Sequence, residues 1–122
     1  MSRDHRRLRV FQDAHRLVIA TYVITRRFPR DEWYGLRRQI RRAAVSIPAN
    51  LVEGNARKTT RDYCSFINIA LGSARELAYL LRLASELQMV PEDPSLVAHA
   101  DSVVAQLCRL QEVMEERAHL KT

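Results

Sequence analysis

Apolar residues recur every three or four positions along most of the chain, in four stretches separated by short polar or proline-containing segments. This spacing matches the turn of an α-helix, so each stretch places its apolar side chains on one face. It predicts four helices, over about residues 10–27, 33–53, 60–87 and 94–118. Only three glycines and four prolines occur in 122 residues, too few for the many turns of a β fold. The sequence therefore predicts an all-α protein.

The ends of the expected helices carry capping signals. The expected N-caps are Asp31 with Glu32, then Thr59 or Thr60, then Asp93, which Pro94 follows at a first helical position. Gly54 is well placed to end the second helix. Pro48 lies inside that helix and removes one amide donor, so a kink rather than a break is expected there.

Short connections between successive helices make neighbours antiparallel. The expected architecture is therefore an up-down four-helix bundle over residues 10–118, preceded by a flexible basic N-terminus over 1–9 and followed by a tail over 119–122. The third helix is apolar over more than one stripe. Such a helix is usually central to a bundle or buries a second face against further copies of the chain.

Basic residues are concentrated in the first half of the chain. Residues 1–61 hold fifteen Lys or Arg against five acids and residues 62–122 hold five against nine, so the halves carry +10 and −4. Arginine's planar fork suits phosphate oxygens. The candidate nucleic-acid-binding residues are Arg26, Arg27, Arg30, Arg37, Arg38, Arg41, Arg42, Arg57 and Lys58.

Two other interpretations of this cluster stay open. It can be a solvated face, partly paired with acids of the second half such as Glu76, Glu86 and Glu112, or it can bind an acidic protein partner. The neighbouring aromatic residues Trp33, Tyr34 and Tyr63 can stack on bases, although aromatic residues at helical spacing are more often part of a core.

A line of polar residues along the second helix forms another candidate group. With two residues of the third helix it predicts a structural polar network of Arg42, Ser46, Asn50, Glu53, Ser73 and Glu76. A paired buried network fixes helix register without needing a substrate, so a structural role is favoured over catalysis.

Motifs for catalysis or cofactor binding are not found in the sequence. The four histidines lack metal-ligand spacing, and no phosphate loop or nucleophile motif occurs, so no metal, no cofactor and no enzymatic activity are expected. No apolar run approaches the roughly 20 residues that cross a bilayer. Cys64 and Cys108 follow no export signal, which favours a reduced, cytoplasmic setting, with Cys64 as a buried thiol.

The stretch from Phe28 to Gly54 reads F-P-x-x-E-x-Y-G-L-x-x-Q-I-R-R-A-A-V-S-I-P-A-N-L-V-E-G, and Asp62 to Leu77 reads D-Y-x-x-F-I-x-I-A-x-G-S-A-R-E-L. These motifs resemble the four-helix-bundle proteins of the 23S rRNA intervening-sequence family, also called S23 ribosomal proteins. The family's paired arginines fall on Arg41 and Arg42, and its Ser, Asn and Glu-Gly positions fall on Ser46, Asn50, Glu53 and Gly54.

The resemblance implies an antiparallel four-helix bundle that assembles as a homopentameric barrel, and it implies no catalytic residues. It also implies kinship with the accessory variability determinants of diversity-generating retroelements, which engage nucleic acid and a reverse transcriptase. The expected function is a non-enzymatic, oligomeric, nucleic-acid-associated protein. The alternative is a scaffold whose basic surface binds an acidic partner such as a reverse transcriptase.

Overall fold

The structure, a computed structural model, describes residues 6 and 8–120, and within that part of the chain it contains helices and no strands. The elements are α1 (Arg9–Thr25), the single-turn 3₁₀ helix η2 (Arg30–Glu32), α2 (Leu36–Asn55), α3 (Thr60–Glu86) and α4 (Pro94–Leu120). The all-α prediction is confirmed. Of the expected N-terminus and C-terminal tail, residues 1–5, 7, 121 and 122 lie outside the described residues, while α1 already begins at Arg9 and α4 continues to Leu120.

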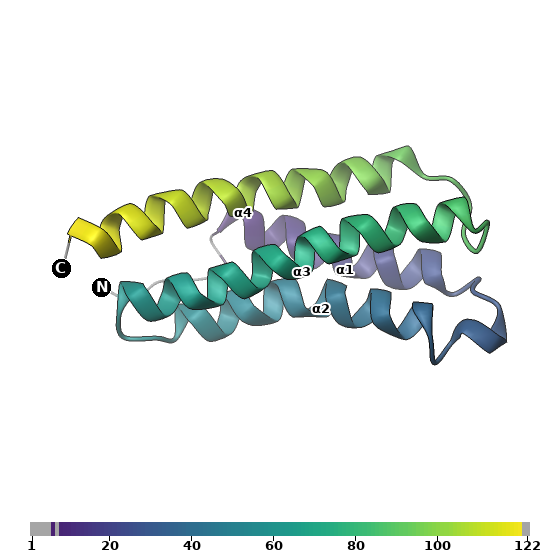
Figure 1. Cartoon of the computed structure of the whole chain (residues 1–122), viewed down its shortest axis with the longest axis horizontal. Coiled ribbons are helices and arrows are strands. Elements are labelled where there is room, and N and C mark those ends of the chain that lie inside the picture. Colours follow the sequence, from purple (N-terminus) through teal and green to yellow (C-terminus); the bar gives the residue numbers. More distant parts are fainter. Residues whose placement is uncertain (1–5, 7, 121–122) are drawn as a thin grey trace.

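The four long helices lie side by side and alternate in direction along the chain (Figure 1). α3 packs against α2 and α4, and α1 packs against the same two helices on the other side, so the bundle is closed. The α1–α2 and α3–α4 connections lie at one end of the bundle and the α2–α3 connection lies at the other. The core contains the predicted apolar stripes, including Leu17, Ile40, Ile47, Ile67, Leu77 and Leu107, each fully buried.

The wide apolar surface of α3 is largely used within the chain. This helix buries more side chains than any other helix, because it faces both α2 and α4. Ile69 and Tyr79 are exceptions and remain 50% and 62% exposed. The expectation that α3 is central to the bundle therefore accounts for most of its apolar residues.

The predicted caps of α3 and α4 are confirmed. The hydroxyl of Thr59 accepts a hydrogen bond of 3.1 Å from the backbone amide of Asp62. The carboxylate of Asp93 accepts one of 3.0 Å from the amide of Leu96, and Pro94 is the first residue of α4. In both cases a side-chain oxygen satisfies an amide that the first turn leaves unpaired.

The two ends of α2 differ from the prediction. The helix begins at Leu36, after η2, and its first amide donates to the carboxylate of Glu32 over 3.2 Å. Gly54 does not end the helix, because α2 continues to Asn55. As expected, Pro48 does not break the helix. Gly54 is instead buried where α2 meets α3: a Cβ atom placed on it would lie 2.7 Å from the Cβ of Phe66.

Asp13 joins α1 to α4. Its carboxylate accepts hydrogen bonds from Gln106 Nε2 at 2.9 Å and from Arg16 at 2.8 Å, and its backbone carbonyl lies 2.9 Å from Nε2 of His99. The hydrogen bond from Gln106, followed by that from Arg16, lowers the pKa of this carboxyl from its ordinary value of 3.8, and partial burial opposes the shift.

This lowered pKa predicts how Asp13 contributes to stability as a function of pH. Because the folded pKa lies below the unfolded one, the stabilisation is present above the unfolded value of about 3.8 and is lost as pH falls through the folded value. Asp13→Asn should therefore be less stable than the parent protein at neutral pH, with the difference shrinking in acid. Urea unfolding of both proteins at several pH values measures this, and a difference independent of pH would contradict it.

Candidate nucleic-acid interface

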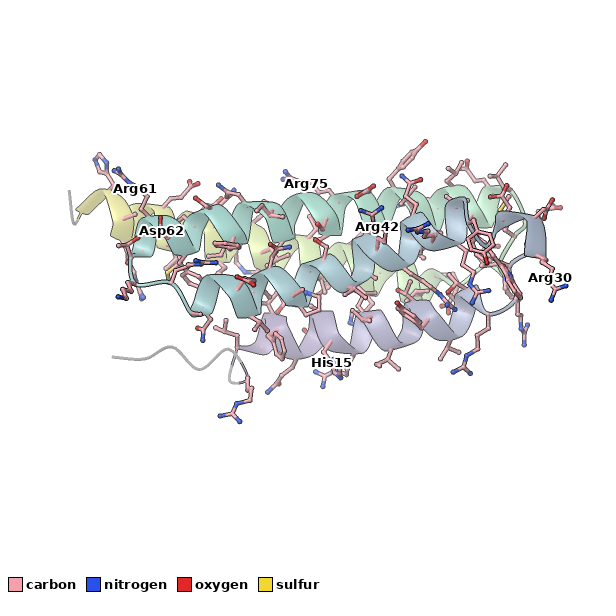
Figure 2. All side chains as sticks on the ribbon, turned by 90° about the horizontal axis from the view of Figure 1, so that it is seen from below. His15, Arg30, Arg42, Arg61, Asp62 and Arg75 are labelled. Atoms are coloured by element: carbon pink, nitrogen blue, oxygen red, sulfur yellow. The ribbon has the colours of Figure 1, made fainter. Side chains whose placement is uncertain are left out.

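The predicted basic residues divide into two groups at opposite ends of the bundle. The larger group surrounds the α1–α2 connection and the first half of α2, and comprises Arg26, Arg27, Arg30, Arg37, Arg38, Arg41 and Arg42. Arg57 and Lys58 follow α2 at the other end, as Figure 2 illustrates with the labelled Arg30 and Arg42 lying far from Arg61. The structure therefore does not bring the nine residues into one site.

Within the larger group, Arg37 and Arg41 form an inner row that packs against aromatic rings. The guanidinium of Arg41 donates to the hydroxyl of Thr25 over 2.8 Å and to the carbonyl of Tyr22 over 3.1 Å, and it lies 4.3 Å from the centroid of the Tyr22 ring. The guanidinium of Arg37 lies 4.8 Å from the Trp33 ring centroid. Both side chains are partly buried, so this row connects α2 to the preceding segment.

The environment of Arg41 disfavours its charge without removing it. Burial, and then the positive charges of Arg37 and Arg26, lower the pKa of the Arg41 guanidinium from its ordinary value. An arginine nevertheless remains protonated near neutral pH. The hydrogen bonds to α1 therefore stay charge-assisted, and the inner row adds positive potential to its surroundings.

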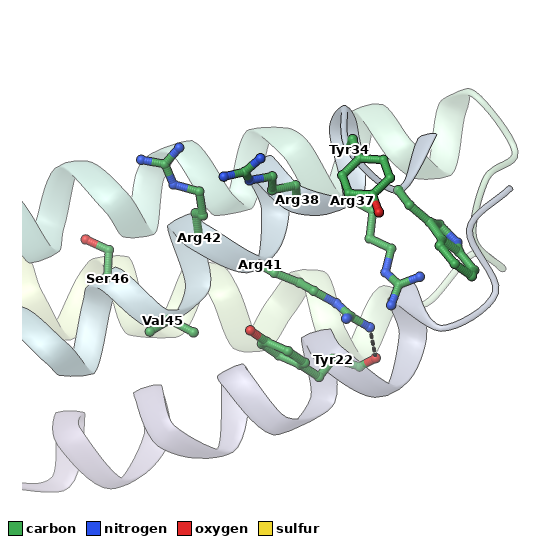
Figure 3. Close-up of a pocket in the computed structure, with 9 residues that line it drawn as sticks. Tyr22, Tyr34, Arg37, Arg38, Arg41, Arg42, Val45 and Ser46 are labelled. Atoms are coloured by element: carbon green, nitrogen blue, oxygen red, sulfur yellow. Dashed lines mark hydrogen bonds between the residues drawn. The ribbon is translucent and has the colours of Figure 1, made fainter. Parts of the chain in front are cut away.

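Arg38 and Arg42 form an outer row with a different environment. Both are exposed, and neither makes a hydrogen bond or an ion pair within the described residues. Figure 3 shows Arg41 reaching from α2 to Tyr22 on α1, whereas Arg38 and Arg42 extend along the other side of α2. The outer row therefore holds two charged groups, about 6 Å apart along the helix axis, that are available to a ligand.

Two hollows flank the outer row. The hollow between α1 and α2, here called the aromatic groove, has a volume of about 650 Å³ and is lined by Tyr22, Trp33, Arg37, Arg41 and Val45 together with four shared residues. The hollow between α2 and α3, of about 690 Å³, is lined by Gly35, Gln39, Ala43, Ser73, Glu76 and the same four. The shared residues form a ridge between the hollows: Tyr34, Arg38, Arg42 and Ser46.

The three candidate aromatic residues have three different environments. Tyr34, in the turn before α2, is 85% exposed and carries no hydrogen bond within the described part of the chain. Trp33 is partly exposed, donates from its indole nitrogen to the carbonyl of Phe28 over 3.1 Å, and has Arg30 5.2 Å from its ring centroid. Tyr63 is 2% exposed and belongs to the core. Tyr34 is thus the ring most open to a ligand.

Pairing with the acidic half of the chain explains little of the basic cluster. Among the described residues, none of the seven arginines of the larger group forms an ion pair with an acid. Glu76 instead accepts a hydrogen bond from Gln39, at 3.3 Å. At the far end, Arg57 pairs with Glu53 over 2.8 Å and lies against the ring of Phe66, while Lys58 is exposed.

The polar network is smaller than predicted. Ser46 and Ser73 share a hydrogen bond of 2.8 Å between α2 and α3, and Asn50 donates to the carbonyl and the hydroxyl of Ser46. The other expected members, Arg42, Glu53 and Glu76, make no hydrogen bond to these three within the described residues. Their side chains are exposed, and Glu53 and Glu76 bond to Arg57 and Gln39 instead.

The described residues hold no group of three or more His, Cys, Asp or Glu that could bind a metal ion. Cys64 and Cys108 are free thiols, and Cys64 is buried, at 7% exposure, as expected. In the same part of the chain, none of the helices has both the length and the hydropathy that crossing a membrane requires.

The sequence does indicate that the arginines form two rows, through the angular position of each arginine relative to the apolar stripe of α2. At about 100° per residue, Arg38 and Arg42 lie opposite the apolar stripe around Ile40, whereas Arg37 and Arg41 lie at its edge. An arginine at the edge of a stripe extends its aliphatic part over apolar neighbours, and one opposite the stripe does not. The same projection places Gly54 inside the apolar stripe.

Comparison with known proteins adds one positive finding. The family model described as 23S rRNA-intervening sequence protein matches residues 6–109, which include α1, α2, α3 and most of α4. A search of curated proteins gave no match to the chain.

Proposed function

The chain belongs to the family of 23S rRNA-intervening sequence proteins, and on that basis we propose that it is a non-enzymatic, oligomeric protein that associates with RNA or DNA through the ridge on α2. The observation that carries the proposal is the outer arginine row. Arg38 and Arg42 are exposed, one helical turn apart, and without an acidic partner within the described residues. Like charges at this spacing repel each other by about 0.2–0.5 kcal/mol, and bound phosphates would relieve that repulsion.

Oligomer formation is the second part of the proposal, with the homopentamer that the family resemblance implies. Its support is the number of large apolar side chains left exposed on neighbouring helices outside the aromatic groove: Ile19 and Val23 on α1, Val52 on α2, and Ile69 on α3. Single exposed apolar residues are ordinary, but several on adjacent helices are typical of surfaces that bind proteins. Measuring the mass in solution tests this part, with the protomer at 14.1 kDa. Each added copy would repeat the ridge.

Charge reversal of the outer row tests nucleic-acid binding. Arg38→Glu/Arg42→Glu should weaken binding to short RNA or DNA by at least about tenfold at low salt, because two phosphate contacts become repulsive. For two phosphates per protomer, log K should fall against log salt with a slope of about −1.8 on duplex DNA and about −1.4 on single strands. Fluorescence anisotropy over a salt series measures both quantities.

The matched control changes the net charge by the same amount as the ridge variant, but at positions away from the ridge. Arg75→Glu/Arg109→Glu alters two exposed arginines on α3 and α4, outside both hollows, and should keep most of the affinity. Equal binding by the ridge variant and the parent protein would refute the proposal. Recovery of one acidic protein in stoichiometric amount and resistant to nuclease, with no nucleic acid bound, would favour the scaffold function instead.

A further inference from the structure

We infer that the aromatic groove and the ridge receive one unpaired nucleotide of a single strand, with its base stacked on Tyr34 and its phosphate held between Arg38 and Arg42. This inference rests on the proposed function and adds a preference for single strands over duplexes. It follows from the position of one exposed aromatic ring in line with two partnerless arginines.

The residues of the ridge are arranged to contact both the base and the phosphate of a nucleotide. Arg38 and Arg42 are one turn apart on α2, and Tyr34 lies in the turn before that helix. All three line both hollows, so they lie along one edge of the aromatic groove. Tyr34 is 85% exposed, which leaves its ring available for stacking. A base on that ring places the adjoining phosphate within reach of the arginine side chains one and two turns further along α2.

The groove beside the ridge has a shape that is already fixed. Its apolar wall is formed by Tyr22, Trp33 and Val45, and its volume of about 650 Å³ lies in the range of small-molecule sites. Arg41 is held by its hydrogen bonds to Thr25 and Tyr22, and Arg37 by the Trp33 ring. These two side chains therefore define the wall and its positive potential, while Arg38 and Arg42 are left to contact the ligand.

Stacking on Tyr34 distinguishes an unpaired base from the other ligands of a basic surface. In a duplex both faces of each base are covered by neighbouring base pairs, so Tyr34 has no face to contact. An acidic peptide or the phosphates of a duplex would use the arginines alone. Stacking also needs no hydrogen bonds to the base edge, so little sequence preference is expected.

The test compares probes of equal charge. Fluorescein-labelled oligothymidylate, an abasic strand with the same number of phosphates, and a duplex with that same total number of phosphates are titrated with the 122-residue chain at low salt. The parent protein should bind oligothymidylate about tenfold more tightly than the abasic strand, since one base stacked on an aromatic ring contributes about that factor. Oligouridylate should behave like oligothymidylate, because neither contact uses the 2′-hydroxyl.

Tyr34→Ala should remove this preference and leave the affinity for the abasic strand unchanged, whereas Tyr34→Phe should retain it. The matched control is Tyr79→Ala, which removes another exposed tyrosine, 62% exposed, from α3 outside the groove. The urea midpoints of these variants should equal that of the parent protein, because the rings are exposed. Trp33, the single tryptophan, gives a second signal: its emission should change with oligothymidylate and not with the abasic strand.

The possible results separate the inference from the function on which it rests. Equal affinity of the parent protein for oligothymidylate and the abasic strand, or an unchanged preference in Tyr34→Ala, would overturn the nucleotide site. The proposed function would survive either result if Arg38→Glu/Arg42→Glu still weakened binding to the abasic strand. Failure of the parent protein to bind any of the probes would overturn both.

Discussion

Gly54→Ala is expected to lower the free energy of unfolding by about 1–2 kcal/mol, although alanine is the better helix former. The added Cβ would lie 2.7 Å from the Cβ of Phe66 and 3.0 Å from Cδ1 of Tyr63. The Phe66 atom is the root of its side chain and cannot turn away, so α2 and α3 must separate. Overpacking of this kind costs about 1–3 kcal/mol, and the helix propensity of alanine offsets up to about 1 kcal/mol.

The chain provides a matched control for this substitution. Gly72 also lies within a helix, but it is exposed and a Cβ placed there meets nothing within 4 Å. Gly72→Ala should therefore raise the free energy of unfolding by up to about 1 kcal/mol. Urea unfolding followed by circular dichroism measures both variants. Equal effects of the two substitutions would show that α2 and α3 do not depend on a close approach at Gly54.

Arg41→Ala is expected to lower the free energy of unfolding by about 1–2 kcal/mol. The substitution removes the charge-assisted hydrogen bonds to Thr25 and Tyr22 and the contact with the Tyr22 ring. The cost of desolvating the guanidinium, seen in its lowered pKa, disappears at the same time and limits the loss. Arg41→Lys should be intermediate, because an ammonium keeps the charge but not the planar fork.

Arg42→Ala is the control for this second prediction. Arg42 is adjacent in sequence, exposed, and without a hydrogen bond or ion pair among the described residues, so its removal should change stability by less than about 0.5 kcal/mol. Urea midpoints of the two alanine variants measure the contrast. A loss of stability in Arg42→Ala as large as in Arg41→Ala would mean that the two rows do not have separate roles.

The helices and two of their caps could be predicted from the sequence because they depend on local interactions. Thr59 and Asp93 bond to amides only three residues away, so their roles follow from residue type and spacing alone. The apolar stripes likewise identify the core, since one face of each helix has to be buried. The fold class and the order of the helices therefore needed no knowledge of tertiary contacts.

The features that could not be predicted depend on a neighbouring helix. A glycine near a helix end is usually a C-cap. The apolar stripe marks Gly54 as a buried position, but only the proximity of Phe66 shows how closely α2 and α3 approach each other there. Only part of the expected polar network forms, for the same reason. Ser46 bonds to Ser73 across the α2–α3 contact, whereas the exposed carboxylates of Glu53 and Glu76 accept hydrogen bonds from Arg57 and Gln39.

The roles of the arginines in the candidate site also depend on contacts with a neighbouring helix. The charge pattern predicted one basic surface, yet Arg41 is used to hold α2 against α1, and Arg38 is left to solvent. The spacing of the charges alone does not separate these two environments, since both residues belong to i, i+4 pairs of arginines. The difference arises from their angular distance to the apolar stripe and from the presence of Tyr22 and Thr25 opposite one row.

The contact of Asp13 with α4 joins the first and last helices, and forming it costs the loop-closure entropy of the chain between them. Gln106 and Asp13 are separated by 93 residues, whereas the Arg41–Thr25 contact between α1 and α2 spans 16. Loop-closure entropy grows slowly with length, by about 0.6 kcal/mol per doubling, so the longer loop costs only about 1.5 kcal/mol more than the shorter one. Joining the first helix to the last is thus almost as favourable as joining neighbours.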